Sequence, residues 1–184
     1  MRVFRWVALG VLLAGVVPAA GQVASGPKVG EKAAPLKVFA VTGPQENKEL
    51  DYTVERKDKP TVFLFVKADK FDRPMARFIR ALDMTVTKLS DDGYIVAVWL
   101  TEDKDKTKEH LPRIQQSVQF QNTALTYFPG EVSGPQDWSI NTDAHLTAVI
   151  VHQGKVAATF GYQSLNETDV PEVEKAIKKA VGKE

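Results

Sequence analysis

Two uninterrupted apolar runs, separated by an amphipathic segment, dominate the middle of the chain. The runs at 61–66 and 94–100 are rich in β-branched and aromatic residues with almost no polar alternation, which is typical of strands buried on both faces of a sheet. Between them, apolar residues recur at spacings of three and four from Met75 to Leu89, which predicts an amphipathic helix of about five turns. A strand, a helix and a second strand joined by short connections predict a βαβ unit with parallel strands and a right-handed crossover.

Weaker patterns predict further elements on both sides of this unit. Residues 37–42 are expected to form a short strand, and residues 50–55 a weak strand at the edge of the sheet. The charged segment 102–116 is compatible with a helix that is broken or restarted at Pro112, because proline lacks the N–H that an interior helical turn needs. Residues 122–128 are expected to add another short strand.

The C-terminal part of the chain is expected to hold a hairpin and a helix. Residues 146–151 and 156–160 are short apolar runs on either side of a turn that contains glycine, which indicates a β-hairpin. The last helix is expected to begin at Asp169, with Glu172 completing a capping box, and to run through Val181.

The first residues have the pattern of an export signal. Arg2 and Arg5 precede an uncharged, mostly apolar stretch, and small residues follow at 19–21, where a signal peptidase would cut. The apolar stretch is shorter than the roughly 20 residues that span a bilayer, so no membrane span is expected after cleavage. We expect a signal peptide over 1–21, an extended leader over 22–35 and a folded domain over 36–182. The expected location is the bacterial periplasm or the cell exterior; the alternative is an uncleaved N-terminal anchor.

Composition changes this picture mainly by exclusion. The 184 residues include no cysteine, so disulfides, thiolate metal sites and thiol nucleophiles are ruled out. Lysine plus arginine number 24 against 23 aspartate plus glutamate, spread without basic blocks. Nucleic-acid binding is therefore not expected. Phosphate-binding glycine loops and hydrolase nucleophile motifs are also missing from the sequence.

Three sequence segments, in this order, carry a resemblance to a known family. They are Val29–Pro35, the strand at 61–66 followed by Phe71–Met75, and the hairpin at 146–156. Together with the order of elements they resemble the thioredoxin superfamily, and most of all its secreted redoxin and peroxiredoxin-like branch (alkyl hydroperoxide reductase and thiol-specific antioxidant proteins). The resemblance implies an α/β fold, a three-layer sandwich with a mixed central sheet flanked by helices.

The departures from the family concern its active site. Where the family has Trp-Cys-Gly-Pro-Cys, this sequence has Phe71, Asp72, Arg73, Pro74 and Met75. Asp72 is expected to cap the helix, and Met75 to pack in its apolar stripe. The resemblance also places a cis-proline before the hairpin, at the position of His145 here. Without that proline, the family's backbone docking of peptide or thiol substrates is in doubt.

Two groups of side chains remain as candidate sites. Tyr127, Phe128 and Trp138 are candidates to line a groove for a partner. Separately, Asp72, Asp143 and His145 are expected near one another at the ancestral groove, where they are an alternative non-thiol catalytic or metal-binding set. The histidines follow none of the common metal-ligand spacings, so no metal and no other cofactor is expected.

The sequence thus favours an exported, redox-inactive thioredoxin-fold protein that acts as a binding or scaffold module. Its expected partner is another envelope protein, within a complex or alone, or a small ligand. The alternative is a non-thiol enzyme or metal-binding protein that uses Asp72, Asp143 and His145. Catalysis by a thiol-disulfide oxidoreductase or thiol peroxidase mechanism is excluded by the missing cysteines.

Overall fold

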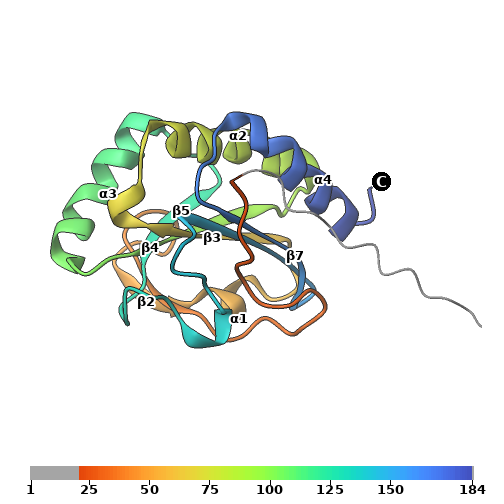
Figure 1. Cartoon of the computed structure of the whole chain (residues 1–184), viewed down its shortest axis with the longest axis horizontal. Coiled ribbons are helices and arrows are strands. Elements are labelled where there is room, and N and C mark those ends of the chain that lie inside the picture. Colours follow the sequence, from red (N-terminus) through yellow and green to blue (C-terminus); the bar gives the residue numbers. More distant parts are fainter. Residues whose placement is uncertain (1–20, 184) are drawn as a thin grey trace, which may run out of the picture.

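A computed structural model describes residues 21–183, and Figure 1 shows their arrangement around one sheet. The strands are β1 (Lys37–Ala40), β2 (Lys48–Asp51), β3 (Thr61–Lys67), β4 (Tyr94–Leu100), β5 (Thr123–Tyr127), β6 (Leu146–His152) and β7 (Lys155–Tyr162). The helices are α1 (Tyr52–Arg56), α2 (Arg73–Leu89), α3 (Lys104–Val118) and α4 (Val170–Ala180), with single 3-10 turns η1 (Ala68–Lys70), η2 (Gln136–Trp138) and η3 (Glu167–Asp169). The expected signal peptide over 1–21 lies, apart from Gly21, outside the described residues.

The sheet has seven strands in the order β2-β1-β5-β4-β3-β6-β7. The β3/β4 and β4/β5 pairs are parallel, and the other pairs are antiparallel. The predicted βαβ unit is therefore confirmed as β3-α2-β4, and the predicted hairpin as β6-β7. β3 lies at the centre, where Val66 pairs with Trp99 on one side and with Leu146 on the other.

The two faces of the sheet are covered differently. Apolar side chains of α2, α3 and α4 pack on the face that carries Val62, Leu64 and Val66, as the upper layer of Figure 1 shows. The opposite face carries Phe63 and Phe65, which pack with apolar residues of α1, η2 and the chain before β1. The mixed sheet flanked by helices is the architecture that the family resemblance implied.

The leader, residues 22–35, is bound to the sheet. Near its start, the Val23 N–H donates to the carbonyl of Gly161 (2.9 Å), and near its end the Ala33 N–H donates to the carbonyl of Gly154 (2.9 Å). Both acceptors belong to the hairpin, so the leader satisfies part of the free edge of β7. In Figure 1 the leader is the red and orange segment that crosses the sheet beside β7.

Close packing holds the middle of the leader against the second face of the sheet. A Cβ added to Gly26 would lie 3.0 Å from Cγ2 of Thr159, and one added to Gly161 would lie 2.7 Å from Cβ of Ser25 and would also clash with the carbonyl of Val23. Glycine at position 161 therefore makes room for the leader. A segment whose composition predicted little burial contributes to the third layer.

The expected strand over 50–55 is corrected to a strand end followed by a helical turn. β2 stops at Asp51, whose side chain accepts a hydrogen bond from the Thr53 N–H (2.9 Å) and so caps α1. Tyr52 is buried as a result. The helical turn forms because an aspartate that caps a helix outweighs a weak strand pattern.

The other two differences concern helix ends and breaks. α3 runs unbroken through Pro112, because Leu111 and Ile114 on either side are buried against the sheet while Pro112 is exposed. The expected capping box of Asp169 and Glu172 is replaced by one between Asn166 and Asp169, which starts η3 before α4. Within the described residues, no helix is long and apolar enough to cross a membrane.

Candidate functional site

The five positions that match the family's active-site motif lie where β3 gives way to α2. Asp72 is the N-cap of α2, and its Oδ1 accepts a hydrogen bond from the Met75 N–H (2.9 Å). Pro74 stands in the first turn, where its missing N–H removes no helical hydrogen bond. Met75 is buried in the core beneath α2. The expected capping and packing roles of Asp72 and Met75 are thus observed.

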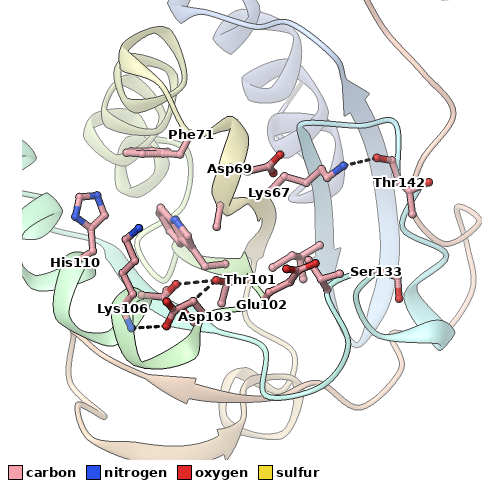
Figure 2. Close-up of a pocket in the computed structure, with 15 residues that line it drawn as sticks. Lys67, Asp69, Phe71, Thr101, Glu102, Asp103, Lys106, His110, Ser133 and Thr142 are labelled. Atoms are coloured by element: carbon pink, nitrogen blue, oxygen red, sulfur yellow. Dashed lines mark hydrogen bonds between the residues drawn. The ribbon is translucent and has the colours of Figure 1, made fainter.

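A cavity of about 670 Å³ opens beside this motif, at the carboxyl ends of β3 and β4 (Figure 2). The start of α3 and the loops around residues 132 and 142 complete its walls. Its lining residues are Lys67, Ala68, Asp69, Phe71, Trp99, Leu100, Thr101, Glu102, Asp103, Lys106, Thr107, His110, Val132, Ser133 and Thr142. Ligands of α/β sheets commonly bind at the carboxyl ends of strands, so this cavity is the candidate functional site and is called the pocket below.

An aromatic pair forms the apolar part of the pocket. The rings of Phe71 and Trp99 have centroids 5.3 Å apart and are tilted by 58°. Trp99 ends up here because it is the penultimate residue of β4, and Phe71 because it directly precedes the cap of α2. Phe71 is half-buried, so part of its ring remains free for contact with a ligand.

Charged and hydroxyl side chains surround this apolar part. Lys67 reaches across the pocket, and its Nζ donates to the carbonyl of Thr142 (2.7 Å), as Figure 2 shows. On the α3 side, Oδ1 of Asp103 accepts from the Lys106 N–H (2.9 Å) and caps the helix. The Thr101 hydroxyl donates to the carbonyl of Asp103 (3.1 Å). The first turn of α3 is therefore held rigidly at the edge of the pocket.

The pKa of the Asp69 carboxyl, at the wall of the pocket, is lowered by its neighbours. Partial burial acts to raise its pKa, but the hydrogen bond and positive charge of Lys70, together with the charge of Lys67, lower it below the ordinary value. Asp69 lies 3.1 Å from Lys70 Nζ. It is therefore a carboxylate, not a carboxylic acid, at neutral pH.

The loop before β6, where the family has its cis-proline, uses its backbone groups internally. The His145 N–H donates to the carbonyl of Tyr162 (2.7 Å), and its own carbonyl accepts from the Lys67 N–H (3.0 Å). No cis peptide bond occurs in residues 21–183. With these groups already paired, position 145 has no backbone edge to offer to an incoming peptide strand.

The alternative set of Asp72, Asp143 and His145 does not form the pocket. None of the three lines it, and Asp143 is exposed, with its N–H donating to Oδ1 of Asn141 (2.9 Å). In the part of the chain that the structure describes, no three side chains of histidine, aspartate or glutamate are placed to hold a metal ion together.

The expected groove of Tyr127, Phe128 and Trp138 is corrected by the burial of Trp138. Its side chain is fully buried between Phe63 and Phe65, with ring centroids 5.1 Å away in both cases. The loop folds back and uses this tryptophan as a core residue because the second face of the sheet lacks a long helix. Tyr127 instead stacks on Phe39 at 5.2 Å.

Sequence reasoning missed most of the pocket, although a signal for it existed. Lys67 ends the buried strand β3 and is followed by Ala68 and Asp69, and Thr101–Asp103 follow directly after β4; the carboxyl ends of neighbouring parallel strands meet at one edge of a sheet. His110 and Thr142 carry no such signal, because only the folding of α3 and of the loop before β6 brings them to the same cavity.

Comparisons with known proteins give the fold. Neither a protein-family model nor a curated protein matches the sequence. Among solved structures, a peroxiredoxin-like protein from Aquifex aeolicus is 15% identical, with 86% of this chain and 91% of that chain covered and a TM-score of 0.60. Peroxidoxin BcpB from Mycobacterium tuberculosis is 12% identical, with 83% and 97% covered and a TM-score of 0.61.

A third structural neighbour is an exposed lipoprotein. The pneumococcal exposed lipoprotein thioredoxin Etrx1 from Streptococcus pneumoniae is 14% identical, with 77% of this chain and 98% of that chain covered and a TM-score of 0.52. Identities this low show the fold alone. The chain has the α/β thioredoxin-like fold, and because it contains no cysteine, thiol-disulfide and thiol peroxidase chemistry are excluded.

Proposed function

We propose that this protein is an exported, redox-inactive binding module of the redoxin-like branch, which holds another envelope protein or a small ligand in the pocket. One observation carries the proposal: the pocket opens directly beside the positions at which the resembled family keeps its cysteine pair, and Phe71 of the degenerate motif forms part of its wall. Asp72 and Met75 stand at the thiol positions, and neither lines the cavity, which lies next to them.

The lining chemistry supports a ligand with both an apolar and a polar part. The exposed portion of Phe71 and the ring of Trp99 offer an apolar contact. Lys106, Glu102 and the hydroxyl of Ser133 are exposed around it. An apolar floor with a few polar groups at the rim is the usual composition of a site that binds a specific ligand.

Recognition in this pocket rests on side chains. The backbone groups of His145 are engaged with Tyr162 and Lys67, so the addition of a peptide as an extra strand is not favoured. A side chain of a partner protein inserted between Phe71 and α3, or a small molecule of similar size, agrees better with the volume of about 670 Å³.

Site-specific photo-crosslinking tests the proposal. A photoreactive phenylalanine analogue replaces Glu102, which is exposed in the pocket, or Met84, which is 53% exposed on the outer side of α2 as a control. In an envelope extract of the producing organism, the probe at position 102 is expected to yield one adduct of discrete mass that position 84 does not yield. Adding Phe71→Ala to the 102 probe should reduce that adduct several-fold.

Two outcomes would overturn the proposal. Equal capture at positions 84 and 102 would mean that the pocket is not selective, and an adduct that survives Phe71→Ala unchanged would mean that the pocket wall takes no part in binding. Phe71 is half-buried rather than a core residue, so circular dichroism can confirm that the variant remains folded.

A further inference from the structure

Asn141, in the loop between η2 and β6, connects the leader to the wall of the pocket. Toward the leader, its Nδ2 donates to the carbonyl of Ala24 (2.9 Å) and its backbone N–H donates to Oγ of Ser25 (2.9 Å). Within the loop, its Oδ1 accepts from the Asp143 N–H (2.9 Å) and its carbonyl accepts from the Ala144 N–H (3.1 Å). All four polar groups of this one residue are therefore used, two on each side.

The leader end of this connection is fixed by the sheet. Oγ of Ser25 lies 2.6 Å from Oγ1 of Thr147, a β6 residue that is 1% exposed. Beside it, the missing side chain of Gly161 lets Val23 and Ser25 lie directly on β7. Residues 23–25 are thus positioned by β6 and β7, and their hydrogen bonds with Asn141 position that residue in turn.

The pocket end of the connection is Thr142. This residue stands between Asn141 and Asp143, lines the pocket, and receives the hydrogen bond from Nζ of Lys67 on the opposite side (Figure 2). A continuous series of hydrogen bonds and covalent bonds therefore runs from the leader through Asn141 and Thr142 to Lys67 at the end of β3.

We propose that Asn141 is a positioning residue that couples docking of the leader to the shape of the pocket, so that an occupied pocket and a docked leader stabilise each other. The meaning of this coupling for ligand binding rests on the proposed function, but the coupling itself requires no ligand. Coupling between two sites is reciprocal. Releasing the leader must loosen Thr142, and releasing Thr142 must loosen the leader.

The first direction can be measured with spin labels, since a chain without cysteine can be labelled only where cysteines are introduced. Labels at Thr142→Cys and Glu102→Cys report the width of the pocket, and labels at Lys88→Cys and Gln116→Cys on α2 and α3 serve as the reference pair. Gly161→Ala, which displaces the leader, is expected to raise amide exchange over residues 22–33. It should also broaden the 102–142 distance distribution and leave the 88–116 distribution unchanged.

The second direction leaves the leader's own contacts untouched. Lys67→Met removes the hydrogen bond to Thr142, and it should raise amide exchange at residues 23–26 by about fivefold or more, the usual lower range for coupled sites. Lys88→Met is the control, because Lys88 is exposed near the end of α2 and does not line the pocket. If Gly161→Ala fails to fold, leader exchange in Lys67→Met alone tests the coupling.

Two results would overturn the coupling: unchanged leader exchange in Lys67→Met, or a leader freed by Gly161→Ala with an unchanged 102–142 distribution. A positive result here combined with negative photo-crosslinking would refute the proposed function while the coupling stands, so the two failures can be told apart.

Discussion

At the scale of single residues, Asp83 is a buried carboxylate that holds two distant parts of the chain together by hydrogen bonds. It lies on α2 with 0% exposure. Its two oxygens accept hydrogen bonds from the Gln121 N–H (2.9 Å), the Asn122 N–H (2.7 Å) and the Thr123 hydroxyl (2.7 Å). Asp83 thereby connects the middle of α2 to the two residues before β5 and to the first residue of that strand. Because it stands between apolar positions of the helix, the sequence pattern assigns it to the solvent side.

Asp83→Ala is expected to lower the free energy of unfolding by at least about 3 kcal/mol, because several buried donors lose their acceptor together. Urea denaturation, monitored by circular dichroism, measures this free energy of unfolding. Asp91→Ala, an exposed aspartate in the turn after α2, should change the value by less than about 0.5 kcal/mol. Similar values for the two variants would show that the hydrogen bonds of Asp83 contribute little.

At the scale of elements, the first turn of α2 has the geometry that stabilises a negative charge at position 72. The Met75 N–H points at the side chain of residue 72, and the helix dipole favours a negative charge there. A cysteine at this position would be stabilised as a thiolate by the same groups.

Asp72→Cys is therefore expected to carry a thiol whose pKa lies below the ordinary value of about 8.5. The pH dependence of its alkylation by iodoacetamide gives the pKa directly, since the chain has no other thiol. Met84→Cys, in the middle of the same helix and 53% exposed, should titrate near the ordinary value. Equal pH midpoints of alkylation for the two variants would show that the start of α2 does not lower the pKa of a thiol.

Sequence reasoning worked best for elements whose pattern is local. The apolar run of β3 and the spacing from Met75 to Leu89 in α2 determine burial without reference to the rest of the chain. It failed where a distant contact decides. Trp138 is buried because the second face of the sheet needs cover, and the pocket exists because α3 and the loop before β6 meet the ends of two strands.

At the scale of the whole molecule, two tyrosines buried at separate positions make the fold sensitive to alkali. The side chains of Tyr52 and Tyr162 are 2% and 1% exposed, and neither hydroxyl finds a hydrogen-bond partner among the described residues. Burial raises the pKa of both phenols far above the ordinary value of about 10, and nearby negative groups, including Glu55 for Tyr52 and Glu172 for Tyr162, add to the effect.

The sign of the resulting pH dependence follows from these raised values. The unfolded chain ionises near pH 10 while the folded protein resists ionisation, so the contribution of both phenols to stability is complete below about pH 10 and is lost as the pH rises above it. Tyr52→Phe and Tyr162→Phe should each reduce the fall in unfolding free energy between pH 9 and 11. At pH 7 they should be as stable as the original protein or up to about 1 kcal/mol more stable, because an unpaired buried hydroxyl is removed. Parallel curves of unfolding free energy against pH for the original protein and the two variants would contradict this expectation.

The docked leader also sets the order in which the molecule can be completed. Ser25 and Thr147 are 122 positions apart in the sequence, so the leader cannot be fixed on the outer edge of β7 until most of the chain has been synthesised. Contacts between such distant segments form slowly, and an open strand edge is a template for pairing with a second chain. We therefore expect docking of the leader onto β7 to be a late and slow folding step, during which the open strand edge exposes the protein to self-association.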